Sequence, residues 1–277
     1  MKESQWYPGN MARAITQLRQ DLKVVDLVVE LLDARVPISS RNPALIRLLQ
    51  NKKHLMLLHK ADRGENAVTE RWLAYFKSID LQALAFSVQV HRHMNDLLRY
   101  LKQQEYSLGY SRLKRPLRLM VVGIPNVGKS TLINCFVSKA VTKTANQPGI
   151  TRGRQWVRIL PGVELLDTPG VLWPKLTEET ALPLAVVGAI PPSRLDVHKM
   201  ALWLLDHYIA RGKEKYLTER YRDLQPGTVD SIFEQIGFTY GCLQAEGKID
   251  FERTAMLILR DFQSGALGRL SLEEPPG

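Results

Sequence analysis

The sequence predicts an α/β domain built on a doubly wound sheet, followed by an all-helical domain. Up to residue 175, short apolar runs alternate with amphipathic stretches, which is the pattern of strands and helices in turn. Beyond that point the helical spacing continues, and no clear strand-like run is present. A hydrophobic content of 45% is sufficient for a proper core. We therefore expect one domain at residues 1–175 and a second at residues 176–277.

The individual elements follow from the same alternation. In chain order we expect a helix at 11–23, a strand at 27–34, a helix at 43–49, a strand at 55–59, a helix at 67–77, a strand at 83–86, a helix at 94–103, a strand at 118–122, a helix at 129–137 and strands at 156–160 and 163–166. The basic, turn-rich stretch 107–116 is expected to be a linker within this domain. In the second domain, breaks at 190–195, 224–227 and 234–238 separate helical segments, and the tail at 273–277 is expected to fray.

The chain carries a net charge of +10, and the distribution of this charge is more informative than its total. Between Tyr106 and Val163 there are ten Lys and Arg residues and no Asp or Glu. A solvated basic face is one interpretation of this segment. A surface for RNA or for a phosphate-rich ligand is the other.

Other features of the composition limit the class of protein. No apolar run approaches the roughly eighteen residues needed to cross a bilayer, and the first residues lack the apolar stretch of a secretory signal. Cys135 and Cys242 lie far apart without metal-ligand spacing, and we expect both to be reduced thiols. These observations predict a cytoplasmic protein without a membrane partner, and we expect it to be a monomer.

A phosphate-binding loop is predicted by GIPNVGKST at residues 123–131, which fits the pattern G-x-x-x-x-G-K-[ST]. The motif follows the apolar run RLMVV and opens a predicted helix, whose N-terminus adds partial positive charge. Lys129 would place its charge on the β- and γ-phosphates, and Ser130 would offer its hydroxyl to Mg²⁺. The residues expected to contact nucleotide here are Asn126, Val127, Gly128, Lys129, Ser130 and Thr131.

A second motif, ELLDTPG at residues 164–170, ends an apolar run in a carboxylate. Asp167 would lie beside the Mg²⁺, and Gly170 would present its N–H to the γ-phosphate. Between the two motifs, QPGITRG contains Thr151. A single threonine is unremarkable, but its position makes Thr151 the candidate to complete the Mg²⁺ shell when a triphosphate is bound.

The stretch LLHKADR at residues 57–63 is similar to the guanine-reading motif Asn-Lys-x-Asp, with His59 in the position of the asparagine. It precedes the phosphate-binding loop, whereas ordinary GTPases have this motif after that loop. Taken alone, a four-residue motif that lacks one member is equally well explained as a polar strand end.

The order and content of the motifs together resemble the circularly permuted GTPases of the ribosome biogenesis GTPase A family. HKAD and FSV (residues 86–88) come first, and the phosphate-binding loop, the switch threonine and DTPG come after. Further matches are WYPGNM at 6–11, DARVPISSRNP at 33–43 and GKIDFERTAMLILRDFQSGALGRLSLE at 247–273. The resemblance implies hydrolysis of GTP to GDP and phosphate with Mg²⁺, a role in late maturation of the large ribosomal subunit, and a helical C-terminal domain that contacts rRNA.

The resemblance also implies roles in the base site. Asp62 would accept hydrogen bonds from guanine N1–H and the 2-amino group, and Lys60 would lay its apolar stem along the base. The usual asparagine donates to N7 and tethers the loop. The imidazole of His59 has one N–H to donate, so we expect guanine selectivity with weaker binding. The remaining expected base contacts are Ala61, Ser87 and Val88.

Two positions bear on catalysis and ion binding. Asn10 stands where the family has a histidine near the attacking water; an asparagine can position water but cannot take its proton near neutral pH. Asn10 is equally well explained as the cap of the helix that follows. Turnover is therefore expected to be slow alone and to depend on the ribosome. Asn126 matches the K⁺ ligand of related K⁺-activated GTPases, or it is a loop residue without a special role.

Two other functions stay open at this point. An RNA-binding scaffold with a degenerate, weakly hydrolysing nucleotide site would be consistent with His59 and Asn10. The intact Lys129 and Asp167 favour an active GTPase instead. An ATPase would use the same phosphate-binding loop, and Asp62 disfavours it.

Overall fold

The computed structural model describes residues 8–49, 52–110, 115–141, 156–166, 177–191 and 195–276. The chain divides into two compact units. Unit 1 consists of Met1–Leu176 together with Glu273–Gly277, and unit 2 consists of Thr177–Leu272. Among the described residues, no helix is long and apolar enough to cross a membrane.

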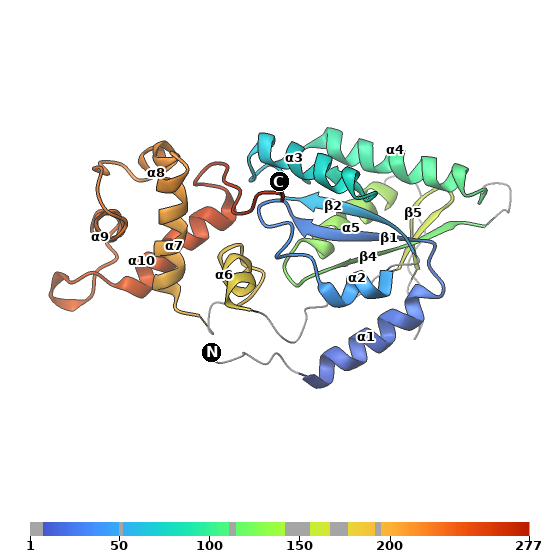
Figure 1. The fold of residues 1–277 in the computed structure, drawn as a ribbon, viewed down its shortest axis with the longest axis horizontal. Coiled ribbons are helices and arrows are strands. Elements are labelled where there is room, and N and C mark those ends of the chain that lie inside the picture. Colours follow the sequence, from blue (N-terminus) through green and yellow to red (C-terminus); the bar gives the residue numbers. More distant parts are fainter. Residues whose placement is uncertain are drawn as a thin grey trace. The chain divides into compact units, whose positions relative to one another are not determined.

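Unit 1 is an α/β domain around a six-stranded sheet (Figure 1). Its strands are β1 (Leu27–Asp33), β2 (Lys53–His59), β3 (Gln82–Ala85), β4 (Leu117–Gly123), β5 (Trp156–Leu160) and β6 (Val163–Leu166). They lie in the order β3-β2-β1-β4-β6-β5, and only the β5–β6 pair is antiparallel. Its helices are α1 (Pro8–Leu22), α2 (Pro43–Leu49), α3 (Asn66–Ser78), α4 (His91–Ser107) and α5 (Lys129–Val141).

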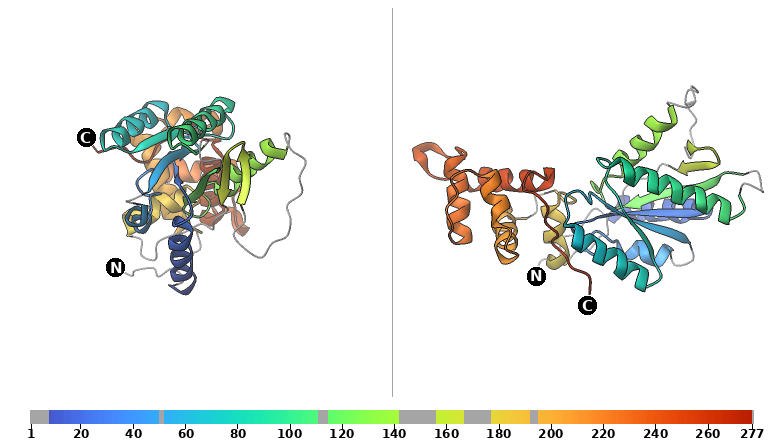
Figure 2. Two further views of the ribbon diagram at one scale, coloured as in Figure 1. Left: turned by 90° about the vertical axis from the view of Figure 1, so that its right-hand side faces the viewer. Right: turned by 90° about the horizontal axis from the view of Figure 1, so that it is seen from above.

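Helices cover both faces of this sheet. On one face, α2 packs Leu45 against Val28 of β1, and α3 packs Trp72 and Phe76 against Leu32 of the same strand. Val28 and Leu32 share a face because they are an even number of residues apart in a strand. Figure 2 shows α4 and α5 on the opposite side of the sheet from α2 and α3. With helices on both faces, every residue of β1 is buried, and the predicted doubly wound sheet is confirmed.

The strand order brings the two predicted nucleotide motifs to one edge of the sheet. β4 follows β3 in the chain but lies beside β1, so the direction of winding reverses between β1 and β4. Ligands of open α/β sheets bind at the carboxyl ends of the strands near such a reversal. Asp33 at the end of β1 pairs with His59 at the end of β2, and Leu31 pairs with Gly123 at the end of β4.

Several helix boundaries differ from their predictions: α4 begins at His91 and α5 continues to Val141, and two further differences have a clear physical reason. The helix predicted at 94–103 extends to Ser107, because the buried face of the helix continues as far as Glu105. Since Glu105 is charged, the sequence did not indicate that this last turn is buried. Glu105 is satisfied there by the ammonium of Lys102. The helix predicted at 11–23 begins earlier, at Pro8, so Asn10 lies in its first turn and does not precede the helix as a cap.

The described residues of unit 2 form helices joined by short irregular segments, with one isolated β-bridge between Leu243 and Ile249. It contains α6 (Glu178–Val186), α7 (Val197–Ala210), α8 (Glu214–Arg220), α9 (Val229–Thr239), the short 3₁₀ helix η2 (Ala245–Gly247) and α10 (Phe251–Ser264). The predicted break at 234–238 is wrong, since α9 continues through this segment. A Cβ at Gly237 would lie 2.7 Å from Thr254 Oγ1 and 2.9 Å from Ile249 Cγ2, so this glycine permits close packing.

The beginning of the tail, at Glu273, packs on unit 1, contrary to the fraying expected there. The carboxylate of Glu273 accepts hydrogen bonds from the N–H groups of Ile38 (2.8 Å) and Ser39 (3.1 Å). Its N–H donates to the carbonyl oxygen of Arg35, and its carbonyl accepts from Trp72 Nε1, both at 3.3 Å. The chain therefore returns to unit 1 after completing unit 2, which is connected to unit 1 at both of its ends.

Candidate functional site

The predicted phosphate-binding loop connects β4 to α5. Gly123 (φ 155°) and Gly128 (φ 111°) both have backbone conformations that favour glycine. A Cβ at Gly123 would lie 2.7 Å from the carbonyl oxygen of Leu31, so glycine is required where β4 approaches β1. Asn126 is exposed at the tip of the loop with φ 55°, a conformation that asparagine tolerates well.

Lys129, at the first position of α5, is a buried cation. It is 8% exposed, and its Nζ donates to the carbonyl oxygens of Gly123 (3.1 Å) and Ile124 (2.6 Å). Burial lowers the pKa of Lys129 to about 8. Carbonyl oxygens carry no net charge, so an anion beside this ammonium would be strongly stabilised. The arrangement fits the phosphates of a nucleotide, and the neighbouring Ser130 and Thr131 are exposed.

The predicted base loop follows β2 and is joined to the segment 86–88 by backbone hydrogen bonds. Ala61 N–H donates to the Phe86 carbonyl oxygen (3.1 Å), and Phe86 N–H donates to that of Leu58 (2.8 Å). The Asp62 side chain is 24% exposed, and its Oδ2 lies 3.8 Å from Arg63 Nε. An accessible carboxylate beside a second loop is the arrangement that the guanine-reading role of Asp62 requires.

The segment 86–88 contributes structure as well as surface. Ser87 is buried, and its Oγ accepts a hydrogen bond from the N–H of Gln89 at 3.1 Å, which shapes the turn before α4. Val88 is half-buried.

His59 links the base loop to the phosphate-binding loop. Its Nδ1 lies 2.8 Å from the carbonyl oxygen of Val127, and its ring stacks on Phe86 with centroids 5.6 Å apart. A Cβ at Gly128 would lie 2.4 Å from His59 Cε1, so the imidazole fills the space against that glycine. Burial, with the nearby charge of Lys60, lowers the pKa of His59 to about 4. His59 is therefore neutral at physiological pH.

Asp33 and Arg35, which open the matching stretch DARVPISSRNP, form a charged network at this edge for which the sequence predicted no role. The Asp33 carboxylate accepts from Arg35 Nε and Nη2, both at 2.9 Å, and from Lys60 Nζ at 3.0 Å. Lys60 Nζ also lies 3.4 Å from the carbonyl oxygen of Asn126. Burial alone would raise the pKa of Asp33, but the charges of Arg35 and Lys60 hold it well below its usual range. Lys60 follows β2, and its ammonium thus contacts both Asp33 at the end of β1 and the loop after β4.

The sequence did contain a signal for Asp33. It ends the apolar run LVVELL in a carboxylate, which is the same pattern that singled out Asp167. A charged residue directly after a buried strand lies at the edge where α/β proteins bind ligands.

The remaining predicted residues are outside what the structure describes. Thr151, Asp167 and Gly170 lie outside the described residues, and so does the side chain of Asn10. Ser130 is thus the described member of the expected Mg²⁺ shell. Within the described ranges, no group of three or more His, Cys, Asp or Glu side chains could hold a metal ion.

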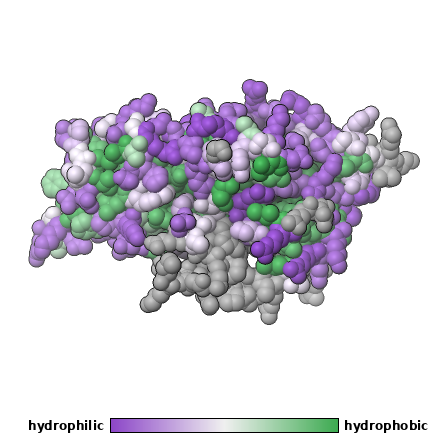
Figure 3. Space-filling model, in the orientation of Figure 1, coloured by the Kyte–Doolittle hydropathy of each residue, from purple (hydrophilic) through white to green (hydrophobic). Residues whose placement is uncertain are grey.

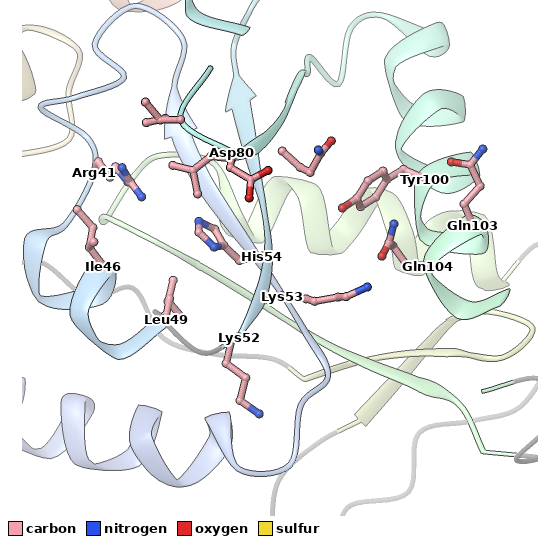
Figure 4. A pocket seen from close by; sticks show the side chains of 13 residues that line it. Arg41, Ile46, Leu49, Lys52, Lys53, His54, Asp80, Tyr100, Gln103 and Gln104 are labelled. Atoms are coloured by element: carbon pink, nitrogen blue, oxygen red, sulfur yellow. The ribbon is translucent and has the colours of Figure 1, made fainter. Parts of the chain in front are cut away.

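A cavity of about 950 Å³ lies at the amino end of β2, the opposite end from His59 (Figure 4). Lys53, His54 and Arg41 line it. The buried Glu30 lies beside His54 and Arg41, with its Oε2 3.7 Å from both His54 Nε2 and Arg41 Nε. Its carboxylate oxygens make no hydrogen bond in the described structure. Burial, opposed by the charge of Arg41, raises the pKa of Glu30 to about 7.

Replacing Glu30 with glutamine should remove a pH dependence of stability. The folded protein holds the Glu30 proton up to about pH 7, whereas the unfolded chain releases it near pH 4.5. The contribution of Glu30 to the free energy of unfolding is complete below pH 4.5 and falls by about 3 kcal/mol as the pH rises to 7. The lowered pKa of His54 acts in the opposite direction in both proteins. Urea denaturation from pH 5 to 8 should show the variant gaining stability over the wild type as the pH rises; a constant difference would contradict a buried, proton-binding Glu30.

Comparisons with known proteins agree with this geometry. The family model described as 50S ribosome-binding GTPase matches residues 118–226, which begin at β4 and leave out the earlier base loop. Ribosome biogenesis GTPase A of Bacillus cereus is 39% identical over 98% of this chain and 94% of its own length, and that of Thermotoga maritima is 31% identical with the same coverage of both chains.

Two solved structures of YlqF from T. maritima also match. The GNP-bound crystal structure has a TM-score of 0.67 and covers 95% of this chain and 98% of its own. The GDP-bound structure has a TM-score of 0.69 and covers 94% and 99%. Both are 27% identical to this chain in sequence.

The fold and the site together define a P-loop GTPase in which the base-reading loop precedes the phosphate-binding loop in the chain and meets it at the carboxyl edge of the sheet. The order of motifs in the sequence predicted this. The chain belongs to the ribosome biogenesis GTPase A family. It is a GTP hydrolase that acts in ribosome biogenesis, and GTPases of this kind generally use Mg²⁺ with the nucleotide.

Proposed function

We propose that this GTPase acts in the cytoplasm in late maturation of the large ribosomal subunit, and that GTP binds between residues 59–62 and residues 123–131. The observation that carries the proposal is the direct junction of these two loops. His59 contacts Val127, Lys60 reaches Asn126, and the buried Lys129 lies beside them without a carboxylate among its described partners. The two halves of a nucleotide site are thus adjacent although their order in the chain is reversed.

Within this site we assign one role to each predicted residue. Asp62 reads guanine, and Lys129 neutralises charge on the β- and γ-phosphates. Ser130, Asp167 and Thr151 would hold Mg²⁺, which would offset the charge that develops on the phosphates. The amide of Asn10 would orient the attacking water. Gly170 would donate its N–H to the γ-phosphate, and the side-chain oxygen of Asn126 would ligate K⁺.

Unit 2 is proposed to contact rRNA of the subunit. The net charge of +10 favours a polyanionic partner. On α10, Arg253 and Arg260 are exposed while Ile258 and Phe262 pack inward, so one helix face is available to phosphates. On the face of the molecule drawn in Figure 3, hydrophilic residues predominate over much of the described surface of both units.

Nucleotide hydrolysis by the purified protein tests this function. We expect turnover of GTP and not of ATP, slow for the protein alone, faster with large ribosomal subunits, and faster in K⁺ than in Na⁺. The reason for the slow basal rate is that Asn10 cannot accept a proton. Lys129→Ala is the control for the site and should remove turnover. Preference for ATP would remove the base assignment, and equal rates with and without subunits would remove the ribosomal dependence.

The two connections of unit 2 suggest how nucleotide state is transmitted. One connection follows residues 167–170, and the other ends at Glu273, which is bonded to the segment after β1. Ordering of residues 167–170 by γ-phosphate would then reorient unit 2. Distances between dye labels on the two units should differ between GDP and a nonhydrolysable GTP analogue. Identical distances in both states would contradict this coupling.

A further inference from the structure

The hydrogen bond of His59 fixes which of its ring nitrogens carries the proton. The carbonyl oxygen of Val127, 2.8 Å from Nδ1, can only accept a hydrogen bond, so Nδ1 must be the donor. A flipped ring would bring carbon Cδ2 to the same distance from the oxygen, well inside the 3.3 Å or so at which C–H···O contacts begin. The proton is therefore on Nδ1.

A neutral imidazole has a single N–H, so Nε2 of His59 carries only a lone pair. The pKa of His59, lowered to about 4 by burial, keeps the ring neutral when the protein is active. His59 is 4% exposed, and its Nε2 has no hydrogen-bond partner in the described structure. The ring thus offers an acceptor and no donor to anything bound beside it.

Guanine N7 is also an acceptor. An asparagine amide has separate donor and acceptor groups, so it can tether the neighbouring loop and donate to N7 together. Imidazole cannot do both. We propose that His59 is a positioning residue that ties the base loop to Val127 and donates nothing to guanine N7, so this GTPase selects guanine without the N7 contact that an asparagine at this position would make.

The inference rests on the proposed guanine site and states which atoms of guanine that site recognises. Base selection is left to Asp62, whose carboxylate faces the N1–H and 2-amino edge, on the other side of the purine from N7. The contact of the imidazole with Gly128 supports a role in holding the two loops at a fixed spacing. For His59 to donate to N7, its N–H would first have to give up the hydrogen bond to the carbonyl oxygen of Val127.

Binding of 7-deaza-GDP, in which C–H replaces N7, tests the inference directly. Calorimetric titration of the full-length protein with Mg²⁺ should give the same dissociation constant for GDP and 7-deaza-GDP, within about twofold. The variant His59→Asn should bind GDP about two- to tenfold more tightly than the wild type does, because it adds one neutral hydrogen bond to N7. Its affinity for 7-deaza-GDP should not rise, since that nucleotide has no N7 to accept the bond.

Two further measurements and two contrary outcomes keep the inference separate from its premises. A ¹⁵N–¹H correlation spectrum of the imidazole should show a protonated Nδ1 and an unprotonated Nε2. His59→Ala should weaken GDP and 7-deaza-GDP by the same factor, because only the tether is lost. Binding of GDP at least fivefold tighter than 7-deaza-GDP in the wild type would overturn the inference while leaving the guanine site intact. Absence of binding by both nucleotides would instead overturn the proposed function.

Discussion

Replacing Asp33 with alanine is expected to lower the free energy of unfolding by about 3–5 kcal/mol, which is the usual cost of breaking a buried ion pair from one side. Arg35 is fully buried and Lys60 is 16% exposed at the side chain, so both would keep their charge and lose the carboxylate of Asp33. The N–H of Arg35 would also lose its bond to Asp33 Oδ1. Urea denaturation, with an unchanged dependence on urea concentration, measures the loss.

Asp96→Ala is the matched control. Like Asp33, Asp96 pairs with two basic side chains, here Arg92 and Arg99, but this group lies on the surface of α4 with side chains 35–87% exposed. Exposed pairs contribute about 1 kcal/mol or less. If Asp33→Ala costs no more than Asp96→Ala, the network at the strand ends does not stabilise the fold.

Much of unit 1 could be predicted because its central strands β1, β2 and β4 are buried on both faces. Such strands are continuous apolar runs, and LVVELLD, LMLLH and LRLMVVG are visible without any structure. Predictions were less accurate where a charge occupied a buried position. Glu105 ended the predicted helix early, and Glu30 within β1 gave no sign of its missing hydrogen bonds.

Glycine and the tail show a second limit of sequence patterns. Gly237 was read as a break, whereas the structure uses it inside α9 for close approach to Thr254. The tail at 273–277 is short, polar and rich in proline, which is typical of a frayed end. Glu273 nevertheless caps the N–H groups of Ile38 and Ser39. Contacts between residues so distant in the chain depend on the fold, and local composition does not report them.

The sequence predicted which residues belong to the candidate site, but it did not predict the hydrogen bonds between them. The phosphate-binding loop was predicted from its motif, and the base loop and the reversed order were predicted from HKAD and FSV together with the family resemblance. The sequence indicated that His59 has one N–H to donate, but only the fold shows that Val127 receives it. Likewise, Lys60 was expected along the base, and the structure adds that its ammonium joins Asp33 to the loop of Asn126.

Replacing Asp62 with asparagine should change the base that this GTPase selects. In the proposed site guanine would present two donors to Asp62, N1–H and the 2-amino group, whereas an amide in the same position would face one of them with its own N–H donor. Xanthine has a carbonyl in place of the amino group, so it presents one donor and one acceptor, which an amide matches. Loss of a charge-assisted hydrogen bond costs about 1.5–3 kcal/mol, so GTP should bind on the order of 10- to 100-fold more weakly to the variant.

The same variant should gain binding of xanthosine triphosphate, which we expect the wild type to reject because its carboxylate would face the carbonyl of the base. Dissociation constants for GTP, XTP and ATP with the wild type and Asp62→Asn measure the exchange. Asp96→Asn makes the same chemical change on the surface of α4 and should alter none of them. Since Lys129 and Ser130 are untouched in the variant, XTP should also be hydrolysed. Unchanged GTP affinity in Asp62→Asn would show that another group reads the base, because no neutral amide accepts both guanine donors.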